Sequence, residues 1–153
     1  MPPMNNRLLR PKPGPSARTL WFEPTDGDAS WGRLGNWYVD AARTVPATRL
    51  PASIDTIVSD GPWVPVLGQR RVVAAAVVDD AGDGQELAGE IVVAAGATFA
   101  GAVIVAGLVV GHATIAESAR LTGTVLGLAT FTGSGCLDGG TATETVPDPP
   151  PAC

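Results

Sequence analysis

Histidine occurs once in these 153 residues, lysine once and cysteine twice, so the side chains that most often carry chemistry are scarce. The single histidine, His112, is accompanied by no GxSxG nucleophile elbow, and no Walker lysine follows the glycine-rich stretches. Cys136 and Cys153 lack CxxC and Cys/His ligand spacing; they either bond to each other or stay free thiols in a reducing compartment. We therefore predict a protein that is not an enzyme, with no catalytic residue, no metal and no cofactor.

Basic residues are almost missing from the second half, where Arg120 is the only one after Arg71. The net charge is −5, and so acidic a body lacks the basic footprint that nucleic-acid binding requires. The acidic run 79–86 lacks the spacing of a helix–loop–helix calcium loop, so we expect a solvated turn there. The segment 1–20 is different, because it contains no acid and four bases, Arg7, Arg10, Lys12 and Arg18. It is either a solvated tail or an arm for an acidic partner.

Charge is absent from residues 91–116, a run long enough to cross a bilayer, and Gly107 and Gly111 form a GxxxG motif within it. A membrane helix at 91–111 is therefore an alternative by hydropathy alone. The period-two pattern described below argues against it, and we predict no membrane partner. The N-terminus lacks the apolar segment of a secretory signal, which favours synthesis in the cytoplasm without standard export.

Strong helix formers are few, whereas glycine (19 residues), proline (14 residues), valine and threonine are common, which favours an all-β protein. Composition divides the chain into four segments. We expect an extended basic Pro-rich anchoring arm (1–19), a Trp-rich capping segment (20–67), a β-solenoid (68–145) and a flexible Pro-rich tail (146–153). Short strands are expected in the capping segment at 19–22, 36–39, 56–58 and 63–67.

The Trp-rich segment holds all four tryptophans, Trp21, Trp31, Trp37 and Trp63. The end of a solenoid exposes an open core and unpaired strand edges, and solenoids need end caps for solubility. Large apolar rings with an N–H group suit such a cap. An aromatic sugar-binding platform is the functional alternative.

An internal repeat of 16 residues is the main signal for the fold. Ala97-Thr98-Phe99 recurs as Ala113-Thr114-Ile115 and as Ala129-Thr130-Phe131, and Val105, Leu121 and Leu137 keep the same spacing. Repeats at a fixed period indicate stacked structural units. The spacing predicts a short parallel β-helix with 16-residue rungs, strongest from about residue 91 to residue 143.

Alternation supports this interpretation. All odd positions from 97 to 139 except Glu117 are apolar or glycine, while many even positions are polar. Side chains alternate between the two faces of a strand, so odd residues are predicted to face the core. Glu117 is expected at a corner that faces solvent. The pattern continues back through Leu87, Ile91 and Val93 and predicts three to four rungs.

Several even positions break the polar pattern. They are Ile104, Leu108, Val110, Leu126 and Leu128, and the repeat places Leu108 and Val110 one rung from Thr124 and Leu126. Exposed contiguous apolar surface usually marks an interaction site. We expect a homo-oligomer, such as a trimer, that associates through Leu108, Val110, Leu126 and Leu128. Coverage by the N-terminal segment of the same chain is the alternative.

Three stretches resemble tailed-phage structural proteins. GHATIAESARLTGTVLGLATFTGS (111–134) is similar to the G-x-A-T-F-x-x-S repeats of β-helical tail-fibre-like or capsid decoration proteins. GNWYVDAARTVPATRLPASIDTIVSDG (35–61) resembles the NW…P…LP…D-x-V-V lead-in of such repeats, and NRLLRPKP (6–13) resembles their short arms. Long fibres carry many more repeats and a distal domain, which this chain lacks.

The resemblance implies a non-catalytic virion component, made in the host cytoplasm, in a decoration, fibre or adaptor role. Its arm, through Arg7, Leu8, Leu9 and Arg10, would attach to major capsid or tail proteins. Two alternatives remain open: a cell-surface adhesive solenoid that binds glycan, and a bactofilin-like self-polymerising scaffold.

Overall fold

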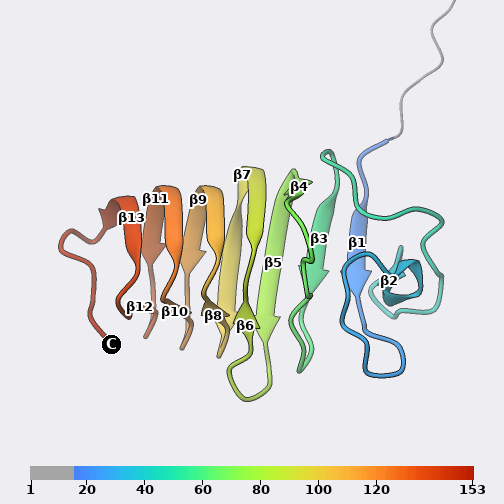
Figure 1. Ribbon diagram of the computed structural model, residues 1–153, viewed down its shortest axis with the longest axis horizontal. Coiled ribbons are helices and arrows are strands. Elements are labelled where there is room, and N and C mark those ends of the chain that lie inside the picture. The colour runs from blue at the N-terminus through green and yellow to red at the C-terminus, as the bar shows by residue number, and fades with distance from the viewer. Residues whose placement is uncertain (1–15) are drawn as a thin grey trace, which may run out of the picture.

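The protein is an all-β parallel β-solenoid of about five turns. The computed structural model describes residues 16–153. The predicted arm residues Arg7, Leu8, Leu9 and Arg10 therefore lie outside the described residues. Figure 1 shows the strands stacked side by side, from β1 at the N-terminal end to β13 at the C-terminal end.

Two sheets form the walls of the solenoid. The larger sheet has nine strands in the order β13-β11-β9-β7-β5-β3-β1-β2, with β4 also paired to β7, and the smaller sheet has the order β12-β10-β8-β6. Every pairing between these strands is parallel except that of β1 with β2. The elements are β1 (Thr19–Phe22), the 3-10 helix η1 (Leu34–Asn36), β2 (Trp37–Tyr38), β3 (Thr56–Ser59), β4 (Arg71–Val73), β5 (Ala75–Asp80), β6 (Glu86–Leu87), β7 (Glu90–Gly101), β8 (Ile104–Val105), β9 (Leu108–Ile115), β10 (Arg120–Leu121), β11 (Thr124–Phe131), β12 (Cys136–Leu137) and β13 (Thr141–Val146).

The 16-residue rung is confirmed in the C-terminal turns. Ala113 pairs with Ala97 and with Ala129, and Leu121 pairs with Val105 and with Leu137. An earlier turn is longer, because Ile91 pairs with Val109 and not with Gly107, after which the register shifts between Val93 and Ala97. The stack also exceeds the predicted three to four rungs, because β3 and β1 continue the sheet beyond β5.

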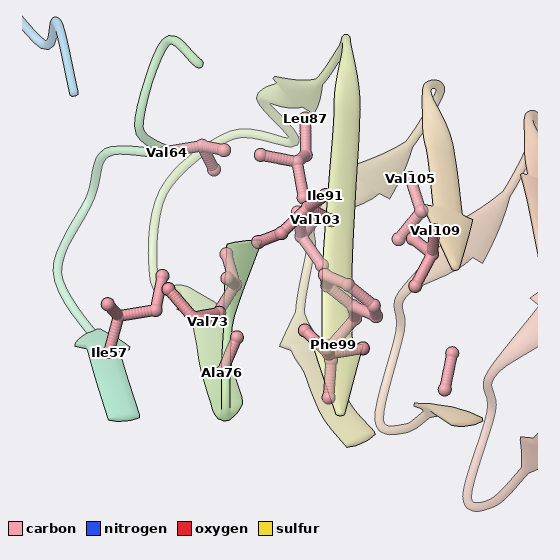
Figure 2. Packing of buried hydrophobic residues seen from close by; sticks show 14 of the residues in the cluster. Ile57, Val64, Val73, Ala76, Leu87, Ile91, Phe99, Val103, Val105 and Val109 are labelled. Carbon is pink, nitrogen blue, oxygen red and sulfur yellow. The ribbon is translucent and has the colours of Figure 1, made fainter. Parts of the chain in front are cut away.

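The interior follows the predicted parity. Among even positions from 98 to 138, only Ala100 is buried. Odd residues form the core, including Phe99, Val105, Ile115 and Leu121. Figure 2 shows part of this core, with Ile91, Phe99 and Val103 in the interior. A parallel stack of this kind buries the same side of each strand, so the apolar columns along the solenoid supply its stability.

Glycine is required where successive corners touch. A Cβ on Gly107 would lie 2.1 Å from the carbonyl oxygen of Gly89, and one on Gly123 would lie 2.1 Å from that of Gly107. Neither contact leaves room for a side chain. Glu117, as predicted, stands at an exposed corner, where its backbone has φ +53°.

The N-terminal segment extends the large sheet. β1 and β3 pair in parallel with each other, and β3 pairs with β5, so no break in the sheet marks the expected boundary after residue 67. Strands at 19–22, 37–38 and 56–59 agree with those expected, whereas 63–67 makes only a single bridge, from Val66 to Ser30. That prediction of a strand was wrong because two prolines, Pro62 and Pro65, interrupt the stretch and remove backbone donors.

Aromatic side chains fill the N-terminal end of the core. Trp31 and Trp37 are buried, with ring centroids 4.9 Å apart, and Phe22 lies 5.0 Å from Trp37. The indole N–H of Trp37 donates to the carbonyl oxygen of Trp31 at 2.8 Å. β2 then occupies the outermost position of the sheet as the antiparallel partner of β1. The rings therefore close this end of the core, and the buried indole N–H of Trp37 has a hydrogen-bond partner.

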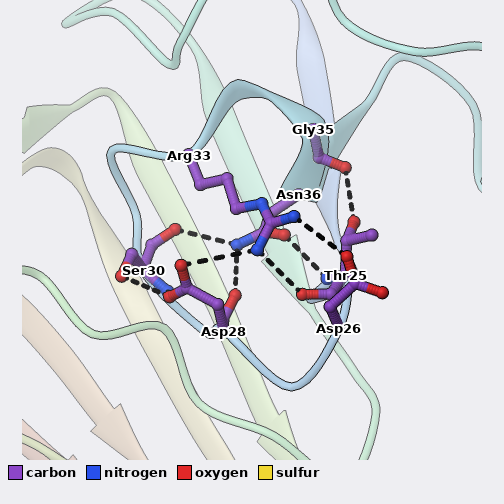
Figure 3. A network of polar contacts seen from close by, with 7 residues as sticks. All are labelled: Thr25, Asp26, Asp28, Ser30, Arg33, Gly35 and Asn36. Atoms are coloured by element: carbon purple, nitrogen blue, oxygen red, sulfur yellow. Dashed lines mark hydrogen bonds and ion pairs between the residues drawn. The ribbon is translucent and has the colours of Figure 1, made fainter.

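A polar network fixes the loop between β1 and β2 (Figure 3). The buried Asn36 side chain donates to the carbonyl oxygens of Asp28 and Ser30, and its own oxygen accepts from the amide of Thr25 at 2.8 Å. Arg33 pairs with the exposed Asp28 and Asp26 on the outside of this loop. Buried amide side chains of this kind replace the backbone pairing that a loop lacks.

Asp55 is a buried carboxylate at the start of β3. It pairs with Arg49 at 2.6 Å and accepts backbone hydrogen bonds from Ala52 and Arg18. Burial by itself would raise the pKa of Asp55, but the hydrogen bonds from Arg49, Ala52 and Arg18 outweigh it and hold the pKa below its ordinary value of 3.8. The ionised carboxylate therefore stabilises the fold above that pH, and this contribution is lost as the pH falls through the lowered pKa.

Replacement of Asp55 by asparagine is expected to lower the free energy of unfolding by about 3 kcal/mol near neutral pH, because Arg49 then loses its charged partner. The difference from the unsubstituted protein should begin to shrink near pH 4, where the carboxylate of the unfolded chain protonates, and it should be lost as the pH falls through the lowered pKa of the native carboxylate. Urea unfolding followed by circular dichroism at several pH values measures both effects. Asp26→Asn, at a side chain that is 83% exposed, is the matched control; an equal loss in both variants would contradict the assignment.

The C-terminal tail, expected to be flexible, is tied to the small sheet. The amide of Leu137 donates to the carbonyl oxygen of Pro151 at 2.8 Å, and the amide of Cys153 donates to that of Leu137 at 3.3 Å. Cys136 and Cys153 form a disulfide, which decides between the two states left open by the sequence. The last residues therefore cover the edge of β12 instead of hanging free.

Candidate functional site

An outward ladder of four apolar side chains crosses the large sheet. Val72 of β4 pairs with Val92 of β7, Val92 pairs with Val110 of β9, and Val110 pairs with Leu126 of β11. Their inward neighbours, such as Val73 and Val109, are buried, so the ladder residues point away from the core. We call Val72, Val92, Val110 and Leu126 the apolar ladder.

The apolar ladder is open to solvent at both ends. The Leu126 residue is 51% exposed and Val72 is 39% exposed, which is high for large aliphatic residues. Leu108 widens the apolar area, because it lies in the neighbouring column between Glu90 and Thr124. Exposed apolar residues are common singly, but a contiguous row across several strands is typical of an interaction surface.

The four site residues predicted on the solenoid are only partly brought together. The register places Leu108 beside Thr124 and Val110 beside Leu126, as expected. Leu128 follows the irregularity at Gly127 and lies opposite Glu144 of β13. Ile104, the other apolar even position, lies on the small sheet between Glu86 and Arg120. Of the four predicted residues, Val110 and Leu126 belong to the apolar ladder, Leu108 borders it, and Leu128 lies apart from it.

Val72 and Val92 were not predicted to belong to this surface. A strict 16-residue spacing places Ala94, not Val92, beside Val110, and the longer spacing of the earlier turns hides this column. The one signal available was the alternation of Ile91, Val92 and Val93, in which an outward valine stands between two inward residues.

His112 stands on the outward face, where its Nε2 lies 3.1 Å from the hydroxyl oxygen of Thr130. Thr130 belongs to an outward column in which Thr98, Thr114 and Thr130 follow one another on β7, β9 and β11. The histidine is thus joined to a row of threonine hydroxyls rather than to a carboxylate. His112 is therefore an exposed polar residue on strand β9.

The acidic run 79–86 forms a structured turn. Asp80 is buried and its two carboxylate oxygens accept from the amides of Gly82 at 2.8 Å and Gln85 at 2.7 Å. The Gln85 side chain then bonds to the backbone at Pro62 and Val64. Among residues 16–153, no group of three or more His, Cys, Asp or Glu side chains is arranged to hold a metal ion. Hydrogen bonds to the backbone thus hold the turn, which is more ordered than the solvated turn expected from the sequence.

Carboxylates repel one another beside this turn. Burial raises the pKa of Asp79, and the charges of Glu117, Asp60 and Asp80 raise it further. Glu117 in turn accepts a hydrogen bond from the amide of Gly101 at 2.7 Å. Glu117 and Asp80 therefore serve corners of the solenoid, where each holds backbone donors that have no partner in a strand.

The fold and this surface define the class of the protein: a β-solenoid with an apolar outward ladder. Comparison with protein-family models, curated proteins and solved structures finds no match. The run 91–111, for which a membrane helix was the alternative, forms strands β7 and β8 and the first part of β9. None of the helices within residues 16–153 has the length and apolar character needed to cross a membrane.

A structural role for Asp80 has a direct test. Asp80→Ala leaves the amides of Gly82 and Gln85 without their acceptor, and the free energy of unfolding should fall by about 2 kcal/mol. Asp83→Ala, at an exposed carboxylate in the same turn, should change it by less than about 0.5 kcal/mol. Urea unfolding measures both. A calcium-dependent rise in the stability of the unsubstituted protein, lost in Asp80→Ala, would contradict a purely structural turn.

Proposed function

We propose that the protein is a non-catalytic structural subunit that associates with further copies of itself through the apolar ladder. The observation that carries this proposal is the unbroken row of Val72, Val92, Val110 and Leu126 across four strands of one face. Burying aliphatic side chains against a like surface is favourable, and a parallel sheet presents them in a flat, regular array.

The residues around the apolar ladder favour association with another protein surface over catalysis. Residues 91–116 contain no charged side chain, so most of the outward face of β7 and β9 carries no cost of burying charge. Glu90, at one border, already pairs with Arg70 at 3.3 Å. His112, at the other border, bonds to Thr130. A charge-free centre with a polar border is the usual anatomy of a protein–protein interface.

For the setting of this assembly we propose a phage virion, with the N-terminal arm attached to capsid or tail proteins. The support is the resemblance of residues 35–61 and 111–134 to β-helical virion proteins, together with the basic charge of the segment 1–18. A short, rigid solenoid with a charged arm suits a decoration or adaptor role, because the solenoid provides a stable body and the arm provides the attachment.

The alternatives gain less support. Burial of Trp31 and Trp37 removes both rings from any sugar-binding platform. End-to-end stacking of solenoids, as in a bactofilin-like polymer, requires open sheet edges at both ends, and β2 occupies the N-terminal edge in antiparallel orientation. We therefore favour association through the side of the solenoid.

Replacing Val110 and Leu126 together by threonine should weaken self-association by at least about tenfold, because the apolar contact of two side chains is lost. Threonine already occupies other outward positions of the same strands, such as Thr114 and Thr130, so the fold should persist. Light scattering coupled to size-exclusion chromatography measures the mass against the 15.5 kDa chain.

The matched control is Val77→Thr with Leu34→Thr, two exposed aliphatic positions outside the ladder. It should associate as the unsubstituted protein does. A monodisperse monomer for the unsubstituted chain at high concentration would refute self-association through the ladder.

The virion setting calls for a separate experiment. Particles released from cells that carry the gene are purified on a density gradient and probed with an antibody against the solenoid. The protein should band with the particles and remain after washing at moderate salt. Recovery only in the soluble lysate would contradict the virion setting, and a change in tryptophan fluorescence on a sugar panel would favour the adhesive alternative.

A further inference from the structure

The large sheet ends at β13 with an unused edge. β13 pairs with β11 on one side, and within residues 16–153 no strand pairs with its other side. An edge strand presents a row of backbone N–H and C=O groups that can accept a further strand.

The N-terminal edge of the large sheet and the C-terminal edge of the small one are covered. At the N-terminal end of the large sheet, the outermost strand β2 is bridged in turn by Pro46 through Tyr38. At the C-terminal end the tail bridges β12 through Ala152 and is held there by the Cys136–Cys153 disulfide. Figure 1 shows the tail leaving β13 and returning to the level of β12 at the other sheet. At its C-terminal end the chain thus closes the small sheet and leaves the large one open.

An open groove of about 410 Å³ runs along this edge. It is lined by Ala142, Thr143, Glu144 and Thr145 of β13 and by Asp148 of the tail. A groove lined by four consecutive strand residues has the shape for an extended peptide.

The groove is acidic and its charges are unpaired. Glu144 and Asp148 form no ion pair with any residue of the part of the chain that the structure describes. Arg120, the only base of the C-terminal turns, is already paired with Asp138. The groove therefore favours an occupant that is extended and basic.

We propose that this occupant is the stretch Met4–Arg10 from the N-terminal arm of a second copy, added to β13 as an extra strand. The sequence MNNRLLR lies between Pro3 and Pro11 and is free of proline, so each of its residues has a backbone N–H to donate. Its seven residues are enough to span the six of β13. It carries two positive charges, at Arg7 and Arg10, and no negative one.

Alternation in a strand supports the match. Neighbouring residues point to opposite faces, so a leucine of the Leu8-Leu9 pair covers the end of the core next to the partly buried Ala142. The arginine that adjoins it then lies on the outer face, on the same side as Glu144, which pairs with the outward Leu128. The occupant thus supplies apolar cover and positive charge in the same seven residues.

Chain length excludes the protein's own arm. A strand added beyond β13 lies seven strand spacings from β1, a straight distance of about 33 Å. Arg10 and Thr19 are nine Cα–Cα steps apart, which reach at most about 32 Å in a fully extended chain and about 28 Å in a Pro-rich one, too short even before any path around the surface. A second copy meets no such limit. Repetition links copies head to tail, and the arm of the first copy in each row stays free for another partner.

A mixing experiment tests this link on full-length chains. Variant one, Arg7→Glu with Arg10→Glu, has a defective arm and an intact edge. Variant two, Glu144→Lys with Asp148→Lys, has an intact arm and a defective edge. All samples also carry Val110→Thr and Leu126→Thr, so that association through the ladder does not contribute.

In sedimentation velocity, the self-association constant of each variant should be about tenfold lower than that of the chain with native charges. The chain with all four charges inverted should recover, because each inverted arm then meets an inverted edge. Asp83→Lys with Glu86→Lys, an equal charge change in β6 and the turn before it, should associate normally. An equimolar mixture of variants one and two should also regain association, because the native arm of variant two meets the native edge of variant one and the inverted arm of variant one meets the inverted edge of variant two.

Three results would overturn the proposal: a mixture that behaves as the sum of its parts, four inverted charges that give no recovery, or an Asp83→Lys/Glu86→Lys control that dissociates equally. Loss of association only on the ladder substitutions, with no effect of the arm or edge charges, would refute this link while leaving the proposed function standing. If the native-charge sample, which carries the two ladder substitutions, still forms head-to-tail rows, the link is supported even where the experiments on the apolar ladder show no association.

Discussion

Parallel stacking of short strands is the constraint on which the rest of this structure depends. Each turn must present its backbone groups to the next turn at the same height, and it must bury the same side of its strands. Inward columns such as Phe99, Ile115 and Phe131 meet the second requirement. Gly107 and Gly123 meet the first, because their corners approach the preceding turn so closely that a Cβ would overlap a carbonyl oxygen. The simple composition of the second half follows from these two demands.

The same constraint leaves the outer side of each strand free to vary, so the outer columns distinguish this solenoid. One column carries valine and leucine from Val72 to Leu126, another carries the threonines at 98, 114 and 130, and the corners carry carboxylates. Each column is a ladder of like groups at the spacing of neighbouring strands. Surface chemistry is therefore arranged in rows parallel to the solenoid axis, and a partner meets a row rather than a single residue.

The sequence predicted the C-terminal turns well because each of them repeats the previous one residue for residue. It failed earlier in the chain for a physical reason: Ala94, Ala95 and Gly96 lengthen one turn, and the register that pairs Val92 with Val110 depends on where those residues bulge. The pairing of β1 with β3 joins strands that lie far apart in the chain and has no local signature. The state of Cys136 was undecidable for a similar reason, since only the path of the tail brings Cys153 to it. The sequence therefore predicted the part of the apolar ladder on β9 and β11 but not the part on β4 and β7.

The bridged tail has one more consequence, for the order in which the structure comes apart. Stacked turns hold only their neighbours, so such proteins tend to unzip from their ends, where a turn has a neighbour on one side alone. Here the last turn is joined covalently to the residues that follow it, and the β12 strand cannot peel away without taking the tail with it. Unravelling that starts at the C-terminus must release a closed loop as one unit, whereas the other end is held by packing and hydrogen bonds without a covalent link. Under oxidising conditions the solenoid thus has a locked end and a yielding end, a polarity that a symmetric stack of turns does not possess.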